Sequence, residues 1–181
     1  MPLVLAGATS GSITIDVPAT AGTNTLTIPA STGTVITTTS PKTGNVIQVV
    51  NATYSTTTTN STQTYADTGL SASITPTSSS SKILILISHV GLSKSAASGD
   101  SAINIRLLRA STSIATLATQ LGYQNSATRL DFSGFFSYLD SPSTTSSTTY
   151  KTQFANANTS QAVSVQSSSD TATMTLLEIA A

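Results

Sequence analysis

Ile83-Leu-Ile-Leu-Ile87 is the longest apolar run in this sequence, and it decides the fold class. Five apolar residues in a row match the length of a buried strand and fall far short of the roughly 18 that a membrane-spanning helix needs. The cluster Pro76-Thr-Ser-Ser-Ser-Ser81, which is typical of a turn, precedes the run. Because the run is apolar on both faces of a strand, we expect it at the centre of a domain or at a contact between subunits.

Strand-like segments of similar length recur through the rest of the chain, separated by clusters of Ser, Thr, Pro and Gly. No stretch shows helical periodicity with caps. Many short strands with regular turns predict an all-β chain with an antiparallel, jelly-roll-like β-sandwich. The expected strands are Val46–Val50, Thr53–Thr58, Leu70–Ile74, Lys82–Val90, Ile103–Arg109, Ser113–Ala118, Leu130–Leu139, Thr149–Ala155, Val163–Gln166 and Thr173–Ile179. The last strand is also apolar on both faces, except for Glu178, which needs a partner or solvent.

Two short repeats lie near the N-terminus. Thr14–Thr23 aligns with Thr25–Thr34 at an offset of 11 residues, and both follow the pattern Thr, apolar, any, apolar, Pro, Ala, Ser/Thr, any, Gly, Thr. Strands this short cannot bury an apolar face alone, so the repeats predict stacking along the chain or between chains. We therefore expect residues 1–36 to be a β-repeat segment that docks or intertwines, 37–45 a linker, and 46–181 the β-sandwich domain.

The composition excludes several classes of protein. Charged residues make up 8% of the chain, the formal net charge is zero, and 38% of residues are hydrophobic, which disfavours disorder. The Lys and Arg residues are scattered, so no nucleic-acid partner is expected, and no segment is expected to insert into a membrane. There is no cysteine for a disulfide or a thiolate metal site. A neutral surface rich in Ser and Thr predicts a chain whose apolar faces meet copies of itself.

His89 is the only histidine, and it ends a strongly apolar strand, so we interpret it as a structural or interface residue. A Ser-His-Asp arrangement stays open, although no Gly-x-Ser-x-Gly nucleophile motif occurs. The aspartates that could complete it are Asp67, Asp100, Asp131 and Asp140.

Two of these aspartates, Asp131 and Asp140, are nine positions apart around an aromatic strand, which leaves a glycosidase carboxylate pair as an alternative. No cluster of residues has the spacing of a zinc or calcium site. We expect a protein that is not an enzyme, with no catalytic, cofactor-binding or metal-binding residues and no cofactor.

The aromatic stretch Phe132–Tyr138 suggests either a sugar-stacking platform or core packing, and a chain without Trp favours the core. Better candidates for contact with a ligand are tyrosines elsewhere, namely Tyr54, Tyr65, Tyr123 and Tyr150. Arg106 and Arg109 flank two leucines on a strand, where a salt bridge between subunits and a ligand contact are equally good interpretations.

Two stretches carry a resemblance. Gly11–Val35 resembles a block in tail-fibre-like virion proteins of bacteriophages, especially phages of marine bacteria and cyanobacteria, and Phe136–Gln153 resembles their C-terminal domains more weakly. The resemblance implies a trimeric jelly roll like that of tumour necrosis factor. Fibres of this kind usually have a long anchor and shaft. Here only about 45 residues precede the globular part, which favours a short appendage or a capsid decoration.

Together these features predict a bacteriophage virion structural protein, a homotrimeric short fibre or surface appendage that contacts the host. A capsid decoration or cement protein is the alternative, followed by a glycan depolymerase. The expected partners are copies of itself, other proteins of the capsid or tail, and a glycan or receptor on the host surface.

Overall fold

The chain divides into two units, Met1–Val35 and Ile36–Ala181. The computed structural model describes residues 3–6, 10–15, 42–94, 101–124, 128–158 and 161–181. In the first unit, β1 (Leu3–Ala6) and β2 (Ser12–Ile15) form an antiparallel hairpin. Most of the predicted repeats over 14–34, and part of the predicted linker over 37–45, lie outside the described residues.

The described part of the second unit is built from strands, with one 3-10 turn as its helical structure. Runs of Thr, Val and Ile favour this outcome because β-branched side chains pack well on a pleated surface. The strands are β3 (Val46–Tyr54), β4 (Thr58–Asn60), β5 (Ala66–Ile74), β6 (Lys82–Lys94), β7 (Ile103–Arg109), β8 (Thr112–Leu121), β9 (Leu130–Asp140), β10 (Thr148–Asn156), β11 (Val163–Val165) and β12 (Ala172–Ile179).

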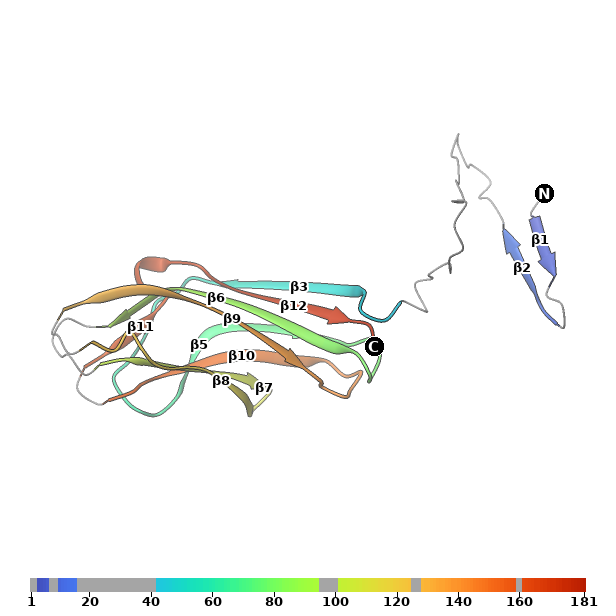
Figure 1. Ribbon diagram of the computed structural model, residues 1–181. Helices are drawn as coiled ribbons and strands as arrows, with labels where there is room; N and C mark the ends of the chain where they lie inside the picture. Colours follow the sequence, from blue (N-terminus) through green and yellow to red (C-terminus); the bar gives the residue numbers. More distant parts are fainter. Residues whose placement is uncertain (1–2, 7–9, 16–41, 95–100, 125–127, 159–160) are drawn as a thin grey trace, which may run out of the picture. The chain divides into compact units, whose positions relative to one another are not determined.

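These strands form two antiparallel sheets that pack face to face as a sandwich (Figure 1). The smaller sheet has the order β5-β10-β7-β8. In the larger sheet β6 is central: β12 and then β11 pair with one side of it, and β9 pairs with the other. β3 lies outside β12, and β4 lies outside β11. The all-β class and the antiparallel sandwich predicted from the sequence are confirmed.

The core lies between the two sheets and follows the period-2 alternation of the strands. Ile83, Ile85 and Ile87 of β6 are buried against residues of the opposite sheet such as Leu70 and Tyr150. A second cluster fills the other end of the sandwich around Leu92, Ile105 and Phe154 (the residues of each cluster come from both sheets). The run Ile83–Ile87 therefore lies at the centre of the domain, one of the two places expected for it.

Several strands differ from their expected bounds, most of all in the first half of the sandwich. The segment Thr53–Thr58, predicted as one strand, is divided: β3 continues to Tyr54 because it stays paired with β12, and pairing resumes at Thr58 in β4. β5 begins at Ala66 and β6 continues to Lys94, both longer than predicted. In each case a glycine with positive φ, Gly69 or Gly91, lets the strand continue through a bulge instead of ending it.

Candidate functional site

His89 lies in the core, where it joins the two sheets. Its Nε2 is 3.0 Å from the hydroxyl of Thr152 on β10, and Nδ1 is 3.3 Å from the amide nitrogen of Gln166. The Thr152 hydroxyl is in turn 2.6 Å from that of Thr68 on β5. Burial lowers the pKa of His89 to about 4, so the ring is neutral near pH 7.

This environment determines what His89 can do. Among the described residues its ring nitrogens face a threonine and a glutamine, so the ring takes part in no Ser-His-Asp arrangement there. Its side chain is fully buried, out of reach of a substrate in solution. The structure thus places His89 as a polar link within the sandwich.

Asp131 and Asp140 are held near the two ends of β9, each by its own partners. Nine residues of strand separate them by about 30 Å, whereas a glycosidase needs its two carboxyl groups within about 10 Å. Asp131 pairs with Arg129 at 3.0 Å on the surface, and the hydrogen bond from Arg129 lowers the pKa of Asp131. The two carboxylates therefore do not form a catalytic pair within one chain.

Asp140 is buried and bonded twice. Arg109 donates to it at 2.9 Å and the Tyr150 hydroxyl donates to it at 2.7 Å. Burial, followed by the Asp140 carboxylate, raises the pKa of Tyr150. Arg109 thus has a partner within its own chain. Tyr150, proposed from the sequence as a ligand contact, is fully buried, so that prediction is wrong. Burial alternates along β10, and Tyr150 occupies one of its inward positions.

The aromatic stretch is divided between core and surface. Phe132, Phe136 and Tyr138 pack against the core clusters. Phe135 alternates with them and is 74% exposed. Among the tyrosines considered as ligand contacts, Tyr123 is exposed and Tyr54 packs against the core.

The outer face of the larger sheet carries one fully apolar row among polar side chains such as Thr175 and Lys82, and this row is the most unusual feature of the sandwich. Residues directly opposite one another in register form a row across four strands, Val49–Leu177–Leu84–Leu139. Beside this row lie further apolar side chains, including Leu86, which is 41% exposed. We call this surface the apolar face; it consists of Val46, Val49, Leu84, Leu86, Phe135, Leu139, Leu177 and Ile179.

Small hydroxyl side chains border the apolar face toward the far end of the strands. Thr173, Ser88 and Phe135 lie opposite one another in a row that is four residues along the strands from the apolar row. Between Leu86 and Phe135 the surface is hollowed by about 340 Å³, with Thr173 and Thr175 on its wall. The surface is therefore an apolar centre with a hydroxyl-rich margin.

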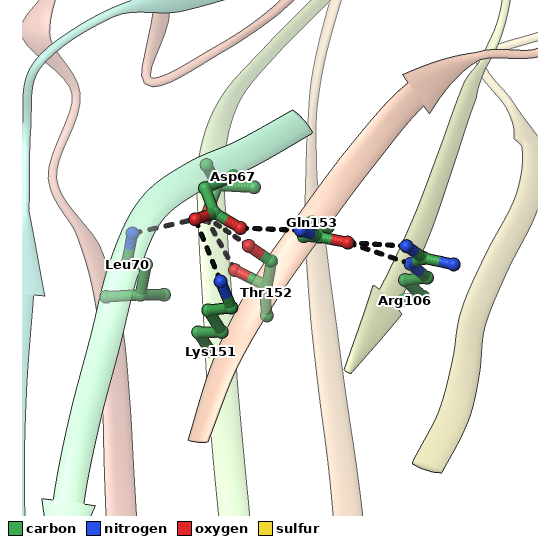
Figure 2. A network of polar contacts seen from close by, with 7 residues as sticks. Asp67, Leu70, Arg106, Lys151, Thr152 and Gln153 are labelled. Atoms are coloured by element: carbon green, nitrogen blue, oxygen red, sulfur yellow. Dashed lines mark hydrogen bonds and ion pairs between the residues drawn. The ribbon is translucent and has the colours of Figure 1, made fainter. Parts of the chain in front are cut away.

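The outer face of the smaller sheet has the opposite character. Asp67, Gln153, Arg106 and Thr116 are opposite one another across its four strands. Figure 2 shows the network: Gln153 donates to Asp67 at 2.7 Å, and its oxygen accepts from two nitrogens of Arg106. Lys151 pairs with Asp67 at 2.9 Å.

Each charged side chain of this polar face has a partner within the chain. Partial burial of Asp67 opposes ionisation, but the hydrogen bonds from Lys151 and Gln153 outweigh it and lower its pKa. The Arg106 guanidinium lies over the Tyr65 ring, 4.0 Å from its centre. Arg106, like Arg109, thus makes contacts within the chain, and the polar face is suited to water.

The sequence indicated part of the apolar face and missed the rest. The two strands recognised as apolar on both faces, Ile83–Ile87 and Thr175–Ile179, supply its middle. Its flanks, Val49 on β3 and Leu139 on β9, were missed. Their signal was a pair of neighbouring apolar residues, Val49-Val50 and Tyr138-Leu139, which places one side chain on each face of a strand.

Over the described ranges, no group of three or more His, Cys, Asp or Glu residues is placed to hold a metal ion. That same part of the chain contains no helix with the length and hydropathy of a membrane span. No protein-family model and no curated protein sequence matches this chain.

Proposed function

We propose that this chain is a structural protein of a bacteriophage virion that works as a homo-oligomer, a homotrimer, with its apolar face covered by copies of itself. The observation that carries the proposal is the row Val49–Leu177–Leu84–Leu139 on the outside of the sandwich. An antiparallel sheet with one face in the core ordinarily presents polar side chains to water on the other.

The extent of the apolar face supports an interface. Four strands about 4.8 Å apart and three two-residue steps of about 6.8 Å each span a patch on the order of 300 Å². A patch of that size is comparable to the largest apolar patch on a typical monomer, which is often functional. The Thr and Ser margin beside Leu86 corresponds to the polar rim of such an interface.

The difference between the two outer faces supports a role in assembly. If copies cover the apolar face, the polar face with Asp67, Gln153 and Arg106 stays toward solvent, where it can meet the host surface or other virion proteins. The absence of cysteine leaves burial between protomers to stabilise a particle exposed to the environment.

The virion and the trimer rest on the resemblance of Gly11–Val35 and Phe136–Gln153 to tail-fibre-like proteins, whose C-terminal domains would be trimeric jelly rolls. A non-enzymatic role is supported by the separation of Asp131 from Asp140 along β9 and by the burial of His89. The role we favour is a short fibre or surface appendage that contacts the host.

Sedimentation velocity of the full chain at micromolar concentration tests the assembly. We expect the mass of three chains. Leu86→Asp, which puts a charge in the apolar face, should give single chains, and Ser113→Asp, on an exposed position of β8, should leave the trimer intact. A wild-type protein that is folded and monomeric would overturn the proposal, as would a Leu86→Asp protein that assembles normally.

A capsid decoration protein is the second candidate, since the apolar outer row could equally be covered by a capsid subunit. Counting copies per particle by quantitative mass spectrometry separates the two, because a cement protein is far more abundant than a fibre. Glycan release by the purified protein, with Asp131→Asn and Asp140→Asn as controls, tests the depolymerase alternative.

A further inference from the structure

β9 is an open edge of the larger sheet. It pairs with β6 on one side, and on its other side no strand lies among the described residues. In an antiparallel strand about half of the main-chain N–H and C=O groups point away from the single partner. Over the 11 residues of β9, five or so amides therefore face outward, ready to pair with another strand.

The protections that natural sheets place on such an edge are missing from β9. Its sequence, Leu-Asp-Phe-Ser-Gly-Phe-Phe-Ser-Tyr-Leu-Asp, contains no Pro, Lys or Arg. The charged residues are confined to Asp131 and Asp140, near its two ends, and each is paired with an arginine. Between these two aspartates the strand exposes Phe135 at its middle and Leu139 near its end, the latter to 57%.

The other four edge strands differ from β9. β4 is only three residues long. β8 shifts its register against β7 three times. β5 is interrupted where Thr68, Gly69 and Leu70 stand opposite Thr152 alone. β3 has a register shift near its start and packs against β5 of the other sheet. The register shift between β6 and β9 places its extra residue in β6 and leaves β9 itself regular. Shortness, bulges within the edge strand and coverage discourage further pairing, so β9 is the edge best suited to accept a strand.

The apolar face needs this edge to make a stable interface. A patch on the order of 300 Å² is well below the roughly 800 Å² that each partner buries in an interface of standard size. The edge of β9 adjoins the apolar face at Phe135 and Leu139, so a strand laid along β9 adds main-chain hydrogen bonds and covers these two side chains at once.

We propose that the open edge of β9 accepts a strand from a second copy of this chain, so that the larger sheet continues from one protomer into the next. This inference rests on the proposed homo-oligomer and specifies how its protomers join. A ring of three requires that the pairing join different surfaces of the two copies, so the donor is a strand outside the sandwich, in the N-terminal hairpin of β1 and β2.

Hydrogen–deuterium exchange of the full chain, read over peptides covering 130–140, tests the inference. In the assembled wild-type protein we expect the amides of β9 that face away from β6 to exchange about 100-fold more slowly than in the dissociated Leu86→Asp protein. The edge strand β8, covering 112–121, is the internal control and should keep outward amides that exchange fast in both proteins.

The outcomes separate this inference from the proposed function. A wild-type oligomer in which outward amides of β9 exchange as fast as those of β8 would overturn strand addition and leave the assembly standing. Equal protection of β9 in the monomeric Leu86→Asp protein would also overturn it, because the protection would then arise within one chain. A monomeric wild-type protein would overturn both.

Discussion

The buried His89 makes the stability of the sandwich dependent on pH above the range where carboxylates titrate. Its pKa is about 4 in the folded chain, against 6.5 for an unperturbed histidine. The unfolded chain therefore takes up the proton first as the pH falls, so the stabilisation is fully present above about pH 7 and is lost progressively toward pH 4. At about pH 5, roughly 1.5 pH units below the unfolded pKa, the loss is about 2 kcal/mol at 1.36 kcal/mol per unit.

Urea unfolding followed by circular dichroism, at about pH 7.5 and about pH 5, measures this loss. The protein concentration must be the same at both pH values, because the stability of an assembly depends on it. The lowered pKa values of Asp67 and Asp131 keep these groups ionised in the folded chain until below their usual value of 3.8, so they contribute little at pH 5.

His89→Gln is the matched control, since glutamine keeps a polar group near Thr152 and does not titrate. Its unfolding free energy should be nearly equal at the two pH values. The reasoning is refuted if the wild-type protein loses no stability at pH 5, or if His89→Gln loses as much as the wild type.

Two further pairs of variants test the packing by thermal unfolding. Gly69 and Gly44 both have positive φ, but a Cβ at Gly69 would clash with the Tyr54 ring, whereas one at Gly44 would meet nothing within 4 Å. Gly44→Ala should therefore cost about 1 kcal/mol and Gly69→Ala several-fold more. Equal costs would contradict the packing. Asp140→Asn removes the buried ion pair with Arg109 and should lower the free energy of unfolding by about 3 kcal/mol. Asp131→Asn, on the surface, should lower it by less than about 1 kcal/mol. The reverse order would contradict the burial assigned to these two aspartates.

The outer faces of the two sheets could be predicted only in part. Alternation within β12 shows that Leu176 and Leu177 point to opposite faces, but it does not say which side the core takes. Likewise the sequence identified Asp140 as a candidate acid and Tyr150 as a candidate ligand contact. Their direct hydrogen bond depends on β9 and β10 approaching from different sheets, and no local pattern encodes it.

Local sequence features were enough to predict that this chain is built from strands, and nearly where the strands lie. Strand formation follows from period-2 alternation, β-branched residues and turn clusters. Only the tertiary structure shows that Val49, Leu177, Leu84 and Leu139 align on one outer surface. It also shows that β9 is an edge strand among the described residues. The physical reason is that register and strand order are set by pairing between segments far apart in the chain, and a shift of one residue would exchange the buried and exposed faces.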